Sequence, residues 1–228
     1  MRHATTSPRD SHTVWLLILL GSVTISGRVV SADEPAKKTF SVVGYLPEYR
    51  VSGLDETVCR QLDELVFFSV EPRSDGTLDT GRLKPAVVKQ LGHLKRKYRI
   101  RLRLCIGGWE RSAAFAACST NDAARTRFIR QMISFCQSHA FDGVDLDWEH
   151  PKGPVQQAAY TRLIVETKKA FTPMQLSVTA AIAGWQQLSP AAGKSLDRIH
   201  LMSYDADGRH STYQQAQKDI DRLRRSGI

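Results

Sequence analysis

Three acidic residues alternate with apolar residues in one short segment of the chain. Asp145, Asp147 and Glu149 are separated by Leu146 and Trp148. In a β-strand successive side chains point to opposite faces, so the three carboxyl groups are expected to share one face. Ionised carboxylates that lie close together in a partly dry site repel each other, and at least one is then expected to hold a proton near neutral pH. The pattern predicts a protonated acid ready to donate beside an ionised acid that orients groups or stabilises charge.

The acidic segment also matches a known signature. Residues 142–149 read DGVDLDWE, which resembles the Asp-x-x-Asp-x-Asp-x-Glu pattern of family 18 glycoside hydrolases, the chitinase group. Residues 104–109 (LCIGGW) are similar to the third strand of that family, and residues 201–205 (LMSYD) to its sixth. The resemblance covers about residues 40–228 and implies an α/β fold of the (β/α)8 TIM-barrel type, with the acids on the fourth strand.

The resemblance implies catalytic roles for four residues. Glu149 would donate a proton to the glycosidic oxygen, and Asp147 would be the orienting carboxylate. Asp145 would lie inside the barrel and share a proton with Asp147. Tyr204 would donate a hydrogen bond to the substrate's acetamido oxygen, although a core aromatic with a surface hydroxyl is the alternative. Asp142 is open between a direct role and a structural cap at the start of the strand.

Further residues are candidates for substrate binding because barrel enzymes present functional groups at the carboxyl ends of their strands. An aromatic ring there could stack on a sugar, or could equally pack in the core. The candidates are Tyr45, Gly108, Trp109, Trp185, Met202 and Asp205.

The position of the acids suggests a mechanism. Glu149 and Asp147 come from one strand and approach a sugar from the same side, whereas ordinary glycosidases place two carboxyl groups on opposite sides of the bond. The resemblance implies substrate-assisted, retaining chemistry, in which the 2-acetamido oxygen attacks the anomeric carbon. We therefore expect a secreted glycosidase that cleaves β-1,4-linked N-acetylglucosamine polymers, such as chitin or chito-oligosaccharides, without a cofactor.

Other functions remain open from the sequence. The chain could be an inactive, lectin-like carbohydrate-binding relative, or an endo-β-N-acetylglucosaminidase. A cation site at the three acids is the least favoured alternative, because they lie on a strand rather than in a flexible ligand loop. No metal is therefore expected.

The amino terminus has the layout of a secretory signal peptide. Two arginines precede an apolar run at residues 14–20, and small and polar residues follow up to Ala32. We expect residues 1–32 to be a signal peptide and residues 33–228 to be the catalytic domain, which would be secreted or periplasmic and not stably inserted in a membrane. An uncleaved anchor or a misassigned start is the alternative.

The chain is basic and carries four cysteines. Its formal net charge is +9, which we interpret as a solvated basic face rather than a nucleic-acid site, since no nucleic-acid motif accompanies it. Weak adhesion to anionic polymers is the alternative. The cysteines show no CxxC spacing, which argues against zinc, and both disulfides and buried free thiols remain open. The sequence does not indicate an oligomeric state.

Short apolar runs alternate with longer amphipathic segments, which is typical of successive βα units. The strands are expected at residues 40–46, 65–70, 100–106, 143–148, 175–182 and 198–204. The helices are expected at residues 80–98, 121–139, 154–171 and 212–225. A complete barrel typically needs about 250 residues. We therefore expect an incomplete barrel of about six βα units, with its first and last strands unpaired on one side.

Overall fold

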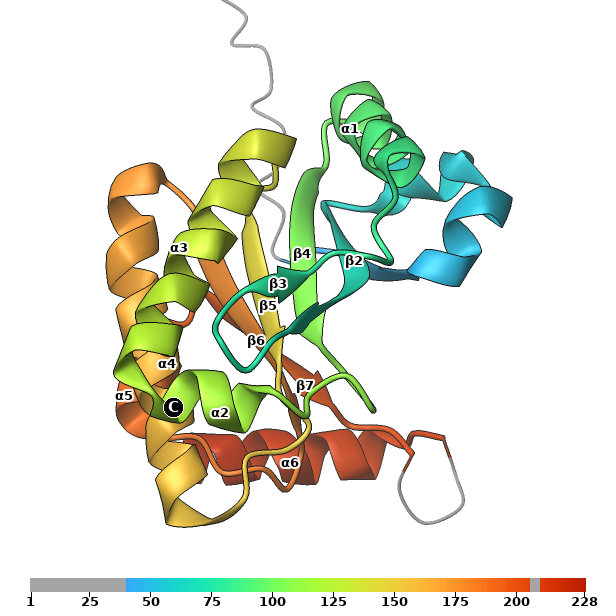
Figure 1. Cartoon of the computed structure of the whole chain (residues 1–228). Coiled ribbons are helices and arrows are strands. Elements are labelled where there is room, and N and C mark those ends of the chain that lie inside the picture. Colours follow the sequence, from blue (N-terminus) through green and yellow to red (C-terminus); the bar gives the residue numbers. More distant parts are fainter. Residues whose placement is uncertain (1–39, 206–209) are drawn as a thin grey trace, which may run out of the picture. The chain divides into compact units, whose positions relative to one another are not determined.

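The structure is a computed structural model, and it describes residues 40–205 and 210–228 (Figure 1). Its centre is a curved sheet of parallel strands in the order β1-β2-β4-β5-β6-β7, and a short strand β3 pairs antiparallel with β2. The strands are β1 Val43–Pro47, β2 Glu64–Pro72, β3 Leu78–Asp79, β4 Arg101–Gly107, β5 Gly143–Asp147, β6 Ser177–Ala183 and β7 Arg198–Met202.

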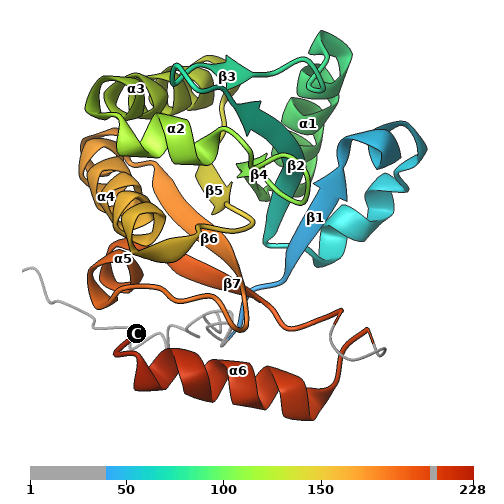
Figure 2. The same cartoon turned by 60° about the horizontal axis from the view of Figure 1, so that its bottom comes forward.

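Helices connect the parallel strands and cover the outer side of the arc, as the view along the strands shows (Figure 2). The α-helices are α1 Pro85–Tyr98, α2 Phe115–Thr120, α3 Asp122–His139, α4 Gly153–Phe171, α5 Pro190–Ser195 and α6 Tyr213–Arg225. Short 3-10 helices lie at Glu48–Gly53, Glu56–Gln61 and Thr172–Met174. The architecture is an incomplete (β/α)8 barrel, as expected from the sequence.

Helix α3 shows how the local sequence defines an element. Asn121 caps its amino end by accepting a hydrogen bond of 2.9 Å from the backbone N–H of Ala124. Its apolar stripe packs against the sheet, with Phe128, Met132 and Cys136 fully buried. The helix ends at Ala140, which adopts a left-handed conformation.

All the strands and longer helices predicted from the sequence are present, but several boundaries differ. The first strand begins at Val43 rather than at residue 40, and α1 begins at Pro85 rather than at residue 80. Strand β3 ends at Asp79, and a turn at residues 81–83 lies between it and α1. The helices α2 and α5 were not predicted because six residues are too few to show a helical period.

The four cysteines are buried free thiols. Burial raises the pKa of Cys105, Cys118 and Cys136 above the ordinary thiol value. Of the two alternatives left by the sequence, the structure therefore shows thiols and not disulfides.

Within the described residues, β1 pairs only with β2, and β7 only with β6. Side chains nevertheless meet across the inside of the arc, because the rings of Tyr45 on β1 and His200 on β7 lie edge to face with centroids 5.5 Å apart. The parts of the chain that the structure describes contain no helix with the length and apolar character needed to span a membrane. The predicted signal peptide, residues 1–32, lies outside the described residues.

Candidate active site

The acidic segment forms strand β5 in the middle of the sheet, between β4 and β6. The predicted alternation is present. Leu146 and Trp148 belong to the hydrophobic core, and Trp148 stacks on the Phe115 ring at 5.3 Å. Asp145 and Asp147 are buried, with 0% and 2% of their surface exposed. The sequence therefore places two carboxyl groups inside the arc, where desolvation makes their charge costly.

Asp145 is surrounded by hydrogen-bond donors. Tyr45 donates its hydroxyl to Oδ2 at 2.7 Å, and Thr179 donates to Oδ1 at 2.5 Å. The Nδ1 atom of His200 lies 3.2 Å from Oδ1. Burial alone would raise the pKa of Asp145, but the hydrogen bond and charge of His200, together with the bonds from Thr179 and Tyr45, lower it below the ordinary value. Asp145 is therefore the ionised member of the row.

Asp147 has the opposite character. Burial, the negative charges of Glu149 and Asp145 and a hydrogen bond with Glu149 raise the pKa of Asp147 to about 9. Its Oδ1 atom is buried without a hydrogen-bond partner among the described residues. Asp147 therefore holds a proton at neutral pH. The structure differs here from the expected proton sharing between Asp145 and Asp147, because Asp147 bonds to Glu149 while other donors occupy Asp145.

Glu149 lies two positions after Asp147, the last residue of β5, and reaches the surface of the site. Its backbone N–H donates to Ser112 Oγ at 3.0 Å, and Ser112 Oγ lies 2.9 Å from the carbonyl oxygen of Asp147. Ser112 therefore joins the loop after β4 to the end of β5. Nothing in the sequence points to this serine, because it precedes Glu149 by 37 positions in an irregular loop.

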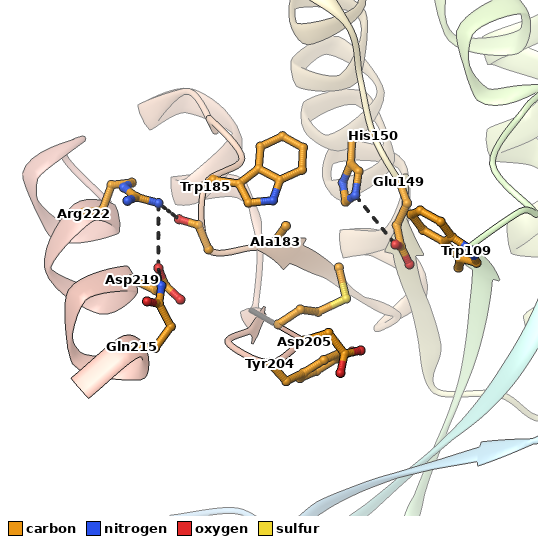
Figure 3. Close-up of a pocket in the computed structure, with 12 residues that line it drawn as sticks. Trp109, Glu149, His150, Ala183, Trp185, Tyr204, Asp205, Gln215, Asp219 and Arg222 are labelled. Atoms are coloured by element: carbon orange, nitrogen blue, oxygen red, sulfur yellow. Dashed lines mark hydrogen bonds and ion pairs between the residues drawn. The ribbon is translucent and has the colours of Figure 1, made fainter. Parts of the chain in front are cut away.

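A cavity of about 910 Å³ opens beside Glu149 (Figure 3). The indoles of Trp109 and Trp185 are 68% and 61% exposed, so both have a free face at its edge. The structure brings together six residues that the sequence proposed: Trp109, Glu149, Trp185, Met202, Tyr204 and Asp205.

Helix α6 and the loop after β6 supply wall residues that the sequence did not indicate. Arg222 donates to the carbonyl oxygen of Gly184 at 2.7 Å, and Gln215 donates to Asp219 at 2.8 Å. These residues line the same cavity as Glu149. Their position depends on how α6 packs, which no local pattern encodes.

Two proposed substrate-binding residues do not line that cavity. Tyr45 instead contacts Asp145, as described above. Gly108 has a φ of 103°, and an added Cβ would lie 2.3 Å from Cζ of Phe68. Its backbone N–H donates to the carbonyl oxygen of Asp147 at 2.8 Å. In the structure, Gly108 sets the path of the chain that carries Trp109.

Asp142 lies at the opposite end of β5 from Glu149. Its Oδ2 accepts from the backbone N–H of Leu102 at 2.8 Å, and its Oδ1 accepts from Lys95 at 2.7 Å. These contacts join β5 to β4 and α1. Of the two alternatives for this residue, the structure shows the structural cap.

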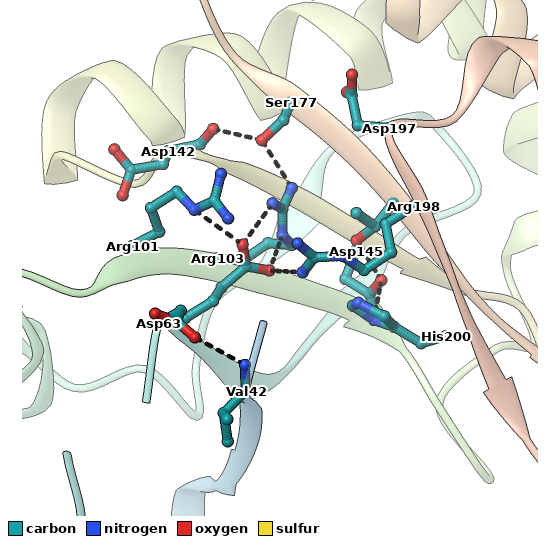
Figure 4. A network of polar contacts seen from close by, with 12 residues as sticks. Val42, Asp63, Arg101, Arg103, Asp142, Asp145, Ser177, Asp197, Arg198 and His200 are labelled. Atoms are coloured by element: carbon teal, nitrogen blue, oxygen red, sulfur yellow. Dashed lines mark hydrogen bonds and ion pairs between the residues drawn. The ribbon is translucent and has the colours of Figure 1, made fainter. Parts of the chain in front are cut away.

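A buried charge network lies below Asp145, toward the amino ends of the strands. Glu64 is fully buried and accepts from Arg103 at 2.7 and 2.9 Å. Arg101 and Arg198 approach the same carboxylate at 3.4 and 3.6 Å. Figure 4 shows the three arginines close together. The network links β2, β4 and β7 beneath the acidic row.

The fold and the site together define a class of protein. A parallel barrel presents a protonated carboxyl group and an outer glutamate from one strand, at the carboxyl ends where barrel enzymes carry their active sites. Exposed aromatic rings flank the outer glutamate, as expected for a site that binds sugar rings. This is the arrangement of a barrel-type glycosidase.

Comparisons with known proteins agree with that class. The family model described as glycosyl hydrolases family 18 matches residues 41–221, and the chain belongs to this family. Probable chitinase 2 of Drosophila melanogaster is 30% identical over 233 residues, which cover 87% of this chain and 47% of that protein. Chitinase 1 of Aphanocladium album is 24% identical, over 88% of this chain and 57% of that protein. The chain thus spans about half the length of the curated relatives that it matches.

Solved structures show the same fold. A GH18 chitinase from Flavobacterium johnsoniae superimposes with a TM-score of 0.71 and 21% identity, over 82% of this chain and 64% of that one. A class V chitinase mutant from Nicotiana tobaccum, in complex with NAG4, has a TM-score of 0.72 and 19% identity, over 82% of this chain and 63% of that one.

Proposed function

We propose that the protein hydrolyses β-1,4-linked N-acetylglucosamine polymers such as chitin or chito-oligosaccharides. One observation carries the proposal: protonated Asp147 lies next to Glu149, and Glu149 opens into a cavity edged by two exposed indoles. The complex of the tobacco relative with NAG4 supports this class of substrate. No cofactor is required by the chemistry.

Glu149 is the proton donor in this proposal. Glu149 takes a proton from solvent before the reaction, and this proton passes to the glycosidic oxygen as the bond from that oxygen to the anomeric carbon breaks. The substrate's acetamido oxygen forms a bond to the same carbon, so no second carboxylate is needed on the far side of the sugar. Asp147 and Tyr204 hydrogen-bond the acetamido group and hold it in position for attack.

Water completes the reaction. A water molecule attacks the anomeric carbon, gives one proton to Glu149 and restores the acetamido group. Two displacements at the same carbon leave its configuration unchanged, so the proposed outcome is retention. Asp145 stays ionised beneath Asp147, and its negative charge helps to keep the proton on Asp147.

The proposal includes export from the cell. The arginines and apolar run within residues 1–32 support a cleaved leader. Amino-terminal sequencing of protein recovered from the medium or periplasm tests it, and the expected mature chain begins after Ala32.

A carbohydrate-binding protein without turnover is the second candidate. Two observations favour it: among the described residues, β1 and β7 each pair with one strand only, and Tyr45 and Tyr204 are 40% and 47% exposed. Calorimetry with chitin oligomers distinguishes the two candidates, because this candidate predicts binding without release of product.

The replacement Glu149→Gln tests the enzymatic proposal. Removing the donated proton is expected to lower kcat on a chromogenic chitobioside by at least about 100-fold, the usual scale of general acid catalysis. The control is Glu71→Gln, a matched change at a surface ion pair with Arg82. Turnover by Glu149→Gln equal to that of the control would refute the assignment.

A further inference from the structure

His150 lies between the proposed proton donor and an exposed indole (Figure 3). Its Nδ1 atom is 3.0 Å from Oε1 of Gln186, so this nitrogen carries a hydrogen that the amide oxygen accepts. Its ring lies against the Trp185 ring, with centroids 4.5 Å apart and an interplanar angle of 63°. Its Nε2 atom faces Glu149, 3.7 Å from Oε2. The three contacts define one orientation of the imidazole.

The loop that supports His150 is itself held by neighbouring elements. Arg222 of α6 bonds to the carbonyl oxygen of Gly184, and the backbone N–H of Gln186 donates to Ala183 at 2.9 Å. Gly184 packs so closely on Asp219 that an added Cβ would lie 2.2 Å from its carboxyl group. The imidazole therefore packs against the loop after β6, and contacts with α6 hold this loop in place.

The contact with Glu149 is shielded from water. The side chains of His150 and Glu149 are 18% and 12% exposed. Partly buried charges are screened less than charges at the surface.

We propose that His150 is a positioning residue for Glu149, and that the charge of its imidazole controls whether Glu149 keeps the proton it donates. The inference rests on the proposed function. In the neutral ring, Nε2 has a free lone pair that accepts a hydrogen bond from the protonated carboxyl group of Glu149. In the cation, which takes its proton from solvent, Nε2–H donates to Glu149 and stabilises its carboxylate. Nε2 and Oε2 are 3.7 Å apart, so either hydrogen bond requires a small side-chain rotation that brings the two atoms closer.

Other charged groups face the same space and are present in every variant. They line the main cavity or a second cavity of about 340 Å³ that His150 also borders, or lie on β5 beneath it. They are Glu110 and Lys152 in the loops after β4 and β5, Asp147 at the end of β5, Asp205 after β7, and Asp219 and Arg222 on α6. A matched change at position 150 alone isolates the contribution of the imidazole.

The first test compares kcat of the wild-type protein with that of His150→Gln, which keeps a polar group near Glu149 but does not titrate. The ratio of wild-type to variant kcat is expected to rise about threefold or more between about pH 5 and pH 8, as the imidazole loses its charge. KM is expected to change little. His150→Asn keeps a group near Gln186 but is too short to reach Glu149, and it is expected to lose more kcat than His150→Gln. A ratio that stays constant with pH overturns the proposal.

The second test needs no turnover. A protonated imidazole quenches an indole in contact with it, so the tryptophan fluorescence of the wild-type protein is expected to decrease as pH is lowered. The Trp185→Phe variant is expected not to show this transition. In Glu149→Gln the transition is expected to move to lower pH, because the carboxylate that faces Nε2 is absent. His139→Gln is the control, since His139 contacts Phe135 and no tryptophan ring.

The two tests separate the two proposals. An unchanged midpoint in Glu149→Gln overturns the role of His150, whether or not the protein turns over substrate and whether or not the variants at position 150 fold. A shifted midpoint without turnover in the wild-type protein supports the contact and contradicts only the proposed hydrolase activity.

Discussion

Neighbouring residues of one type acquire opposite properties in this site. Asp145 and Asp147 lie two positions apart on the same face of β5, and both are buried. Donors from Tyr45, Thr179 and His200 keep Asp145 ionised. Asp147 lacks comparable donors, and adjacent negative charges favour its protonated form. A raised and a lowered pKa side by side indicate an acid–base site.

Asp147 predicts an unusual dependence of stability on pH. Its folded-state pKa of about 9 exceeds the ordinary value of about 3.9, so the folded protein holds a proton that the unfolded chain releases. The stability that depends on Asp147 is fully present below the pKa of the unfolded chain, and it is lost as pH rises toward the pKa of the folded protein. Asp147→Asn does not titrate and so avoids this loss. At pH 7 its unfolding free energy is expected to exceed that of the wild-type protein by about 1 kcal/mol or more.

Urea denaturation of the wild-type protein and Asp147→Asn at several pH values measures this effect. The stability advantage of the variant is expected to grow from about pH 4 to pH 9, while its kcat falls. Asp221→Asn, on the surface of α6, is the matched control. A difference between wild type and Asp147→Asn that does not vary with pH would contradict the raised pKa.

At the scale of elements, the ends of β4 and β5 position the site together. Gly107 and Gly108 adopt φ values of 96° and 103°, which L side chains rarely adopt. This turn lets the chain pass beneath the Phe68 ring and leads into Trp109 and Ser112. Ser112 then returns to the backbone of Glu149. The loop after β4 therefore positions both Trp109, a candidate surface for sugar stacking, and Glu149, the proposed proton donor.

Gly108→Ala tests the importance of this turn. The new methyl group would overlap Phe68 and strain the backbone, so a loss of about 3 kcal/mol in unfolding free energy is expected. Gly53→Ala is the control, because no atom lies within 4 Å of its added Cβ. Thermal unfolding measures both. Equal midpoints for the two variants would show that the turn tolerates a side chain.

At the scale of the whole molecule, polar side chains inside the arc connect strands that share no backbone hydrogen bonds. The Glu64 network joins β2 and β4 to Arg198 on β7. One layer above it, Tyr45 on β1 meets His200 on β7 and Asp145 on β5. These contacts connect the first and last strands of the arc to each other and to β5.

Glu64→Gln is expected to open this arrangement. It removes the only carboxylate that contacts Arg103 in the described chain and leaves buried positive charge, which typically costs about 3–5 kcal/mol. Glu64 also has a lowered pKa, because the three arginines outweigh the effect of burial. The contribution of Glu64 to stability is present above its ordinary pKa of about 4.3, and it is lost as pH falls through the pKa of the folded protein. Urea denaturation at pH 7 measures the unfolding free energies of Glu64→Gln and of the control Glu71→Gln. Equal values for the two variants would contradict the prediction.

Much of the fold and of the acidic row follows from local sequence. The alternation in residues 143–149 determines which side chains enter the core and which enter the arc, because strand geometry repeats every two residues. The stripe of Phe128, Met132 and Cys136 likewise determines the buried face of α3. Both signals act over a few residues, so they can be recognised without knowing the fold.

The tertiary structure alone decided the protonation and orientation of the groups in the site. Asp145 is ionised because Tyr45, Thr179 and His200 reach it from three other strands. His150 faces Glu149 because the loop after β6 holds its ring. A pKa depends on charges, donors and desolvation at distances of a few ångströms, and residues that are far apart in the chain supply them. The sequence therefore determined which groups are candidates for the chemistry, and the packing of the strands decided which of them holds the proton.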